Sequence, residues 1–321
     1  MQALRLRREK VRNFPSPRIV SPCRRIRYLA AWNAPCRSTR GAPDHDFRPT
    51  IMAKHPPAPR MRGTDEQLRD IAEAAACIVD RAWGEASAGN ISVRLPTVPV
   101  PRQHAKSVPL QVPFPMLGGA VFLVTATGTR MRDIATDPAR YTLALRVSKR
   151  GDAYAAAPVG GTGYAPPTSE LAVHLAVHAH LAARGRRERA VVHAHATEVI
   201  AITHNPAYCA GKQHDDRTAM GTESGKSGSS IHPMSPAGPN PLTNLVWSMH
   251  PEAALLIPRG VAVAPYARTG TQALADATVR ALEDTAVVVW EKHGILAVGD
   301  DCMRAFDLID VVAKALRVYF L

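Results

Sequence analysis

Two histidines, His193 and His195, stand one residue apart in an apolar run at 189–196. The run predicts a short buried β-strand, and alternate side chains of a strand point to the same face. Both imidazoles would therefore lie side by side on a rigid element. Two neutral nitrogen donors in that arrangement make half of a tetrahedral zinc site, although such a pair can also be an ordinary core or surface feature.

A third histidine, His293, follows the strongly apolar segment at 287–290, and Gly294 comes directly after it. The segment predicts a strand that ends in a turn, and side chains at such turns commonly face a cleft. Three histidines from two neighbouring strands could then converge. Three protein ligands that leave one coordination position open are typical of catalytic rather than structural zinc.

Glu170, His174 and His178 form a rival set of metal ligands. They follow one another at i, i+4 and i+8 in a predicted helix over 170–183, so they share one helix face. The alternative is a partly buried stripe of hydrogen-bonded histidines. Glu170 differs from the two histidines because it falls in the first turn of the predicted helix, near the positive end of the helix dipole.

Three short segments could bind an anion such as phosphate. Thr168 and Ser169 precede the helix that begins at 170, where free backbone N–H groups and two hydroxyls gather, although helix capping explains both residues equally well. Glycine turns at 88–90 and 127–129 each adjoin a predicted strand, and the N–H groups of such turns can form nests for phosphate oxygens. Each turn taken alone is a weak indication.

The elements that must position these residues follow from apolar periodicity. The first helix is predicted from Thr64, where a capping-box pattern runs to Gln67. Further helices are predicted at 170–183, from 197, at 271–283 and from 300 to the end. Strands are predicted at 91–95, 120–124, 189–196, 253–257, 261–263 and 286–290, and a last strand follows the turn at 293–294 and ends at 298. One loop is predicted at 96–118, and another follows the segment 125–129 and ends at 166–169. The alternation of strands and helices predicts a layered α/β domain.

The positive charge of the chain is concentrated at one end. Residues 1–62 hold 15 Lys and Arg against 3 acids, and the rest of the chain holds 25 against 24, so the net charge of +13 belongs almost wholly to the first segment. We expect residues 1–62 to be a disordered basic leader, either a transit peptide or an upstream translated region. The near-neutral remainder has no basic stripe with interleaved aromatics, which argues against a nucleic-acid partner.

Residues 63–321 predict one domain, interrupted at 206–241 by a flexible insertion rich in Gly, Ser and Pro. The five scattered cysteines contain no CxxC pair, which argues against a disulfide framework and favours a reducing compartment. No apolar stretch reaches the roughly 18 residues of a membrane-spanning helix. We therefore expect a soluble cytoplasmic protein, or an organellar one if the leader is a transit peptide.

The motifs occur in an order that resembles the class II aldolase and adducin superfamily. They are Gly-Asn-Ile-Ser-Val-Arg at 89–94, Thr-Ala-Thr-Gly at 125–128, Pro-Thr-Ser-Glu-Leu at 167–171, His-Ala-His-Ala-Thr at 193–197 and His-Gly at 293–294. The resemblance covers about residues 64–320 apart from the insertion. It implies a single three-layer α/β/α domain whose central mixed sheet is largely antiparallel.

The resemblance also implies roles for particular residues. His193, His195 and His293 match the three zinc ligands of the family, with one ion per subunit, and Glu170 matches its catalytic glutamate. Glu252 matches an acid near the aldehyde end of the substrate. The positions that contact the substrate phosphate correspond to Asn90, Thr127, Gly128 and Ser169.

The implied activity is a lyase reaction of rhamnose metabolism, catalysed by a homotetramer. L-rhamnulose 1-phosphate would split reversibly into dihydroxyacetone phosphate and L-lactaldehyde through a zinc-stabilised enediolate. An L-fuculose-phosphate aldolase and a ribulose-phosphate 4-epimerase are alternatives in the same fold, and for the epimerase we expect Asp rather than Glu at position 170. An inactive, adducin-like interaction module without metal is the alternative from another class, and it predicts loss of the histidines.

Overall fold

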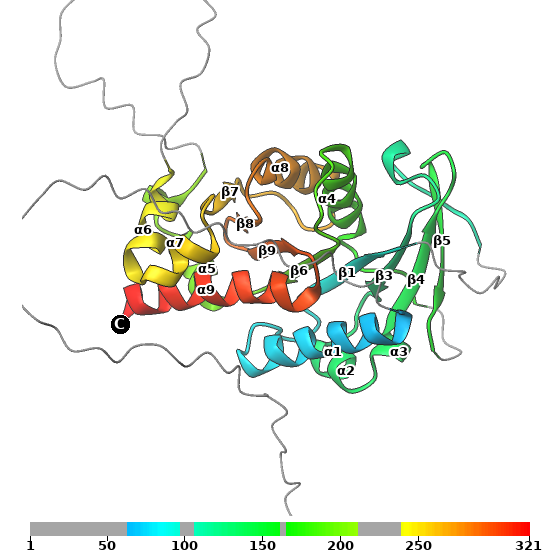
Figure 1. The fold of residues 1–321 in the computed structure, drawn as a ribbon, viewed down its shortest axis with the longest axis horizontal. Helices are drawn as coiled ribbons and strands as arrows, with labels where there is room; N and C mark the ends of the chain where they lie inside the picture. Colours follow the sequence, from blue (N-terminus) through cyan, green and yellow to red (C-terminus); the bar gives the residue numbers. More distant parts are fainter. Residues whose placement is uncertain (1–62, 97–105, 161–164, 211–238) are drawn as a thin grey trace, which may run out of the picture. The chain divides into compact units, whose positions relative to one another are not determined.

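The computed structural model describes residues 63–96, 106–160, 165–210 and 239–321 (Figure 1). The predicted leader at 1–62 and residues 211–238 of the predicted insertion lie outside these ranges. The described ends of the insertion contain a short 3₁₀ helix, η2 (Pro206–Tyr208), and lead into helix α6 (Pro241–Met249). In the described part of the chain, no helix combines the length and the apolar character needed to cross a membrane.

The described residues form alternating strands and helices. The strands are β1 (Asn90–Leu95), β2 (Val108–Pro109), β3 (Val121–Thr125), β4 (Thr142–Val147), β5 (Ala153–Pro158), β6 (Ala190–Ala194), β7 (Ala262–Ala264), β8 (Val287–Trp290) and β9 (Gly294–Gly299). The other helices are α1 (Thr64–Asp80), η1 (Pro115–Leu117), α2 (Met131–Thr136), α3 (Pro138–Tyr141), α4 (Leu171–Ala183), α5 (Thr197–Ile202), α7 (Pro251–Leu256), α8 (Gln272–Leu282) and α9 (Cys302–Phe320).

All the described strands join one sheet in the order β2-β5-β4-β3-β1-β6-β9-β8-β7. β7 pairs with β8 in parallel, and the other pairings are antiparallel. β6 lies between β1 and β9, with His193 directly opposite Asn90 on one side and opposite Leu296 on the other. The prediction of a mixed, largely antiparallel central sheet is confirmed.

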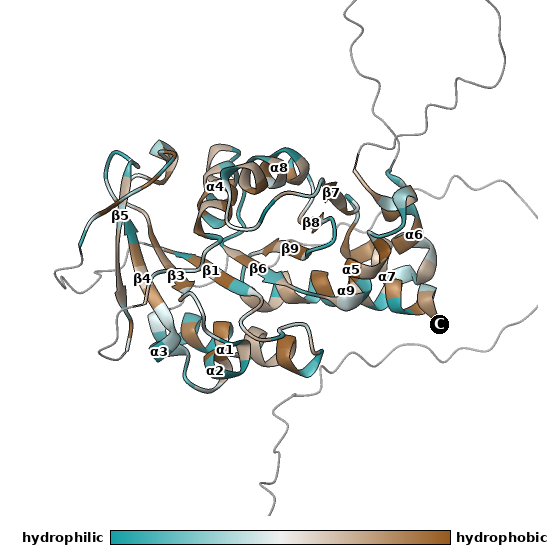
Figure 2. Cartoon of the chain, turned by 180° about the vertical axis from the view of Figure 1, so that it is seen from behind, coloured by the Kyte–Doolittle hydropathy of each residue, from teal (hydrophilic) through white to brown (hydrophobic). Residues whose placement is uncertain are grey.

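Helices cover both faces of this sheet and make it the middle of three layers. Helices α4 and α8 pack on one face, and α1, α2, α5, α6, α7 and α9 pack on the other (Figures 1 and 2). Because neighbouring strand residues point to opposite faces, Val191 joins the core under α4 and α8 whereas Val192 joins the core under α9. β9 is apolar on both faces and is hydrophobic along its length in Figure 2.

The segment predicted as a strand at 253–257 is helical, and that prediction is wrong. Helix α7 begins at Pro251, whose locked φ and missing N–H suit the first turn of a helix. Ala253 is the one residue of α7 that is fully buried, while Leu255 is 78% exposed. The apolar run therefore packs through Ala253 and Ile257, which are both buried, rather than through a strand face.

Two further predictions differ from the structure. The capping box at Thr64 is wrong, because Gly63 is the N-cap of α1 and no side chain caps that helix. β4 and β5 occupy part of the stretch that was predicted as a loop. β5 is rich in alanine, which has a low strand propensity, and its residues are mostly only half-buried, so its sequence lacks the alternating pattern of a strand.

Gly294 lies where β9 passes closest to β6. A Cβ added there would stand 2.5 Å from the carbonyl oxygen of Ala194 and 3.1 Å from Cε1 of His193. We expect Gly294→Ala to push the two strands apart and to lower the free energy of unfolding by about 1–3 kcal/mol, as measured by urea denaturation. Glu73→Ala is the control, because it places alanine at an exposed position inside helix α1. Equal losses in both variants would contradict the close approach.

Candidate active site

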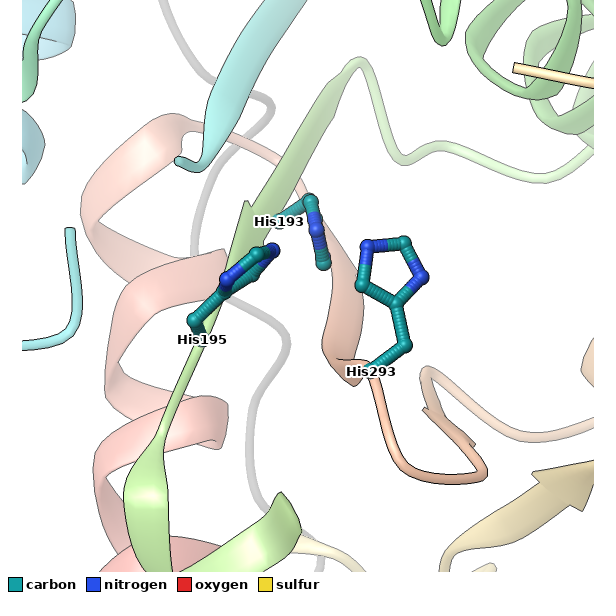
Figure 3. Close-up of side chains that lie close together, drawn as sticks. All are labelled: His193, His195 and His293. Carbon is teal, nitrogen blue, oxygen red and sulfur yellow. The ribbon is translucent and has the colours of Figure 1, made fainter. Parts of the chain in front are cut away.

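The structure brings the three sequence-predicted histidines together. His193 lies in β6, His195 directly follows that strand, and His293 lies in the turn between β8 and β9 (Figure 3). One ligand atom of each histidine lies within 4.8 Å of the others. They converge because β9 pairs with β6, which places the β8–β9 turn beside the end of the histidine strand.

Outer hydrogen bonds orient two of these rings. Nδ1 of His193 donates to the carbonyl oxygen of Ile295 at 2.9 Å, and Nδ1 of His195 lies 2.6 Å from Oε1 of Glu85. Bonds of this kind select one tautomer and leave the other ring nitrogen available to a metal. Nε2 of His193 and Nδ1 of His293 are buried and have no hydrogen-bond partner among the described residues.

Burial keeps two of the imidazoles uncharged. It lowers the pKa of His193 well below the ordinary range and the pKa of His293 to about 4, and the neighbouring histidines lower both pKa values further. A neutral imidazole is the form that coordinates a metal ion. Buried nitrogens without a partner are costly unless something binds them, so this donor set fits a transition-metal ion.

Glu170 lies against the same cluster. Its Oε1 is 3.5 Å from Nε2 of His293, and its Oε2 is 3.6 Å from Nε2 of His193. Glu170 is the N-cap of α4 rather than a residue of its first turn, and its side chain is almost completely buried. Its charge is supported by the positive end of the α4 dipole and by Asn90, whose Nδ2 donates to Oε2 at 2.9 Å.

A pocket of about 190 Å³ opens in front of these groups. It has room for several water molecules or for a small ligand. Its lining joins Glu170 and the three histidines to all four positions that were predicted to contact phosphate, which are Asn90, Thr127, Gly128 and Ser169. Gly128 has a φ of +69°, a left-handed conformation that favours glycine, and Thr127 and Ser169 are exposed.

Thr269 is a pocket residue that sequence reasoning did not single out, whereas Thr129 belongs to the glycine turn at 127–129 that was predicted to bind an anion. Ser87, Thr129 and Thr269 also line the pocket. Thr269 comes from the loop before α8, and a Cβ on the next residue, Gly270, would lie 3.0 Å from the carbonyl oxygen of Ser169. This close approach brings together two loops about a hundred residues apart in the chain, and no local sequence pattern predicts it.

Glu252 lies outside the pocket. It stands in the first turn of α7, its side chain is 65% exposed, and Nδ1 of His250 lies 3.2 Å from its Oε2. The structure therefore does not place Glu252 among the residues that line this pocket, and its place near the aldehyde end of a substrate stays a prediction. The reason is the helix at 251–256, which packs with α6 and α9 and not at the pocket.

The rival ligand set is also not brought together as a metal site. His174 and His178 point into the interior, where Nδ1 of His174 lies 2.6 Å and Nε2 of His178 lies 2.8 Å from Oγ of Ser92. Burial lowers the pKa of His174 to about 4 and that of His178 well below the ordinary range, so both rings are neutral. The hydrogen-bonded stripe is the alternative that the structure supports.

Comparisons with known proteins identify the family of the chain. Residues 69–320 match the family model of the class II aldolase and adducin N-terminal domain. The chain is 33% identical over 261 residues to a rhamnulose-1-phosphate aldolase of Bacteroides thetaiotaomicron, an alignment that covers 79% of this chain and 85% of that protein. It is 28% identical to the Listeria welshimeri protein of the same name, over 78% of this chain and 82% of that one.

A solved structure of the same fold also matches. The sugar-phosphate aldolase from Thermotoga maritima superposes with a TM-score of 0.62 at 27% identity, covering 80% of this chain and 94% of that one.

The histidine cluster makes a direct prediction about metal affinity. We expect His293→Ala to abolish stoichiometric zinc binding, because it removes one of three ligand atoms. We expect Glu85→Ala to weaken zinc binding by about 10–100-fold, because it removes the outer partner of His195. Titration of the metal-free protein with zinc, followed by elemental analysis, measures both effects.

His250→Ala is the matched control for the zinc titration. His250 is also paired with a carboxylate, but it lies outside the pocket, so this variant should bind zinc like the wild type. Unchanged zinc binding in His293→Ala would remove His293 from the ligand set.

Proposed function

Because the chain belongs to the class II aldolase and adducin family, we propose that it is a metal-dependent lyase that reversibly cleaves L-rhamnulose 1-phosphate to dihydroxyacetone phosphate and L-lactaldehyde. The observation that carries this proposal is that one pocket is lined by the three histidines, by Glu170 and by the residues that we propose to bind phosphate. The rhamnulose-1-phosphate aldolases to which the chain is similar support this choice of sugar.

The proposed metal is zinc, one ion per subunit, held by His193, His195 and His293. Support comes from the donor set, because three imidazoles, of which burial keeps those of His193 and His293 neutral, are a donor pattern typical of catalytic zinc. A zinc ion bound there supplies a Lewis acid that stabilises negative charge on the oxygens of the substrate as the carbon–carbon bond breaks.

The proposed role of Glu170 is to move the proton. In the cleavage direction the C3–C4 bond of the ketose breaks, the hydroxyl on C4 loses its proton as it becomes the aldehyde, and C3 gains one. A carboxylate beside the three histidines and facing the pocket can hold a proton and transfer it at that carbon.

The phosphate of the substrate would lie against Thr127, Gly128 and Ser169. The glycine turn offers backbone N–H groups, Ser169 adds a hydroxyl, and the start of α4 adds the positive end of a helix dipole. Phosphate held at this end fixes the carbon chain relative to Glu170, so that cleavage becomes effectively unimolecular.

We also propose that the protein works as a homotetramer in the cytoplasm, which rests on the family resemblance. Static light scattering of the purified protein should report a mass of about four chains, each of 34.6 kDa. A mass of one chain at working concentration would contradict the proposed assembly.

Glu170→Gln tests the proposed chemistry. We expect this variant to bind zinc like the wild type but to lose about 10²–10⁴ in kcat, because an amide cannot take up or return the proton. The measurement is coupled detection of dihydroxyacetone phosphate released from a panel that contains L-rhamnulose, L-fuculose and related ketose 1-phosphates. Glu73→Gln, at an exposed position of α1, is the matched control.

The same panel decides between the proposed function and its alternatives. Release from L-fuculose 1-phosphate in preference to L-rhamnulose 1-phosphate would replace the proposed substrate. Inertness of the zinc-loaded wild type toward every member would overturn the aldolase function.

A further inference from the structure

A continuous row of hydrogen bonds leads from Glu170 into the interior of the domain. Nδ2 of Asn90 is 2.9 Å from Glu170, and Oδ1 of Asn90 is 2.5 Å from Nε2 of His174. Nδ1 of His174 is 2.6 Å from Oγ of Ser92, which is 2.8 Å from Nε2 of His178. All five residues are buried, and the function proposed above uses neither histidine nor Ser92.

The chemistry of the groups gives this row a direction. An ionised Glu170 only accepts, so the Asn90 amide donates to it and turns its oxygen toward His174. Nε2 of His174 must therefore carry the proton, and Nδ1 of this neutral ring accepts from the Ser92 hydroxyl. The oxygen of Ser92 then accepts from Nε2 of His178. Each donor in the row thus points toward the carboxylate of Glu170.

Matched spacings of a strand and a helix build this row. Asn90 and Ser92 are two residues apart in β1 and face α4, which separates them by about 6.6–6.8 Å along the strand. Glu170, His174 and His178 are four residues apart, or about 6 Å along a helix axis. The spacing of the strand side chains therefore matches the spacing of the helix side chains. Each of the two strand side chains forms hydrogen bonds with two successive helix side chains.

We propose that His174 and Ser92 are positioning residues for proton transfer by Glu170. The proposal rests on the function proposed above. The N–H of His174 holds the Asn90 amide in the one orientation that donates to Glu170, and the Ser92 hydroxyl holds His174 in the tautomer that makes this possible. Without them the amide can turn over and present its oxygen to the carboxylate, which repels it and leaves Glu170 without its donor.

If His174 and Ser92 have this role, replacing either residue should impair proton transfer but not the binding of substrate or metal. Ser92 and His174 do not line the pocket, and neither belongs to the histidine cluster. We therefore expect Ser92→Ala and His174→Leu to keep zinc content and the KM for the ketose phosphate. Both should lower kcat and the exchange of the carbon-bound proton of dihydroxyacetone phosphate with D₂O, each by about 10–100-fold.

Two variants control this experiment. His174→Gln keeps an amide N–H that can reach Asn90, so it should recover most of the exchange rate that His174→Leu loses. Thr278→Val removes a fully buried hydroxyl on α8, which packs against α4 but takes no part in the row, so its exchange rate should equal that of the wild type. Urea denaturation identifies variants that are folded at the assay temperature.

A readout on the wild type does not depend on the variants. In protein with ¹⁵N-labelled histidine, the His174 ring should show a proton on Nε2 and none on Nδ1, and a proton on Nδ1 alone would overturn the proposal. Folded Ser92→Ala and His174→Leu proteins with wild-type exchange rates would overturn it too. Absence of both cleavage and exchange in the zinc-loaded wild type is the distinct outcome that overturns the proposed function itself.

Discussion

The antiparallel pairing of β6 with β1 on one side and with β9 on the other sets the positions of the groups at this site. The pairing with β1 places Asn90 directly across from His193, and the pairing with β9 places the turn that carries His293 beside the end of β6. A shift of the register by one residue would turn His193 to the opposite face of the sheet. Gly294 permits the close approach of β9, because a Cβ there would meet the backbone of β6.

The polar groups of this region are unusual for the middle of a layered domain, because they interrupt an otherwise apolar core between the sheet and α4. Burying them is tolerable because Asn90, Ser92, Glu170 and His174 satisfy one another and the histidines stay neutral. The atoms left without a protein partner include Nε2 of His193 and Nδ1 of His293, which belong to the candidate metal centre. Nδ1 of His178, at the inner end of the hydrogen-bonded row, also has no partner among the described residues, so the lack of a partner does not by itself mark a binding group.

Much of this arrangement was predictable from local pattern. Alternation in a strand placed His193 beside His195, and the spacing of Glu170, His174 and His178 placed them on one helix face. The order of the motifs identified the family and, with the family, the three-layer domain and its central sheet. These inferences succeed because strand and helix periods are properties of a few consecutive residues, which the sequence states directly.

The tertiary structure alone decided which faces meet. It turned His174 and His178 toward Ser92 rather than toward a metal, and it brought Thr269 to the pocket through a loop contact. It also placed Glu252 at an exposed position in the first turn of α7, away from the pocket, and made a helix of most of the segment 253–257 that had been predicted as a strand. The sequence by itself determined which histidines are candidate ligands and on which faces of their elements they lie, because side-chain faces follow from the backbone period. The partners of each face depend on strand order, register and packing over hundreds of residues, which no local pattern contains.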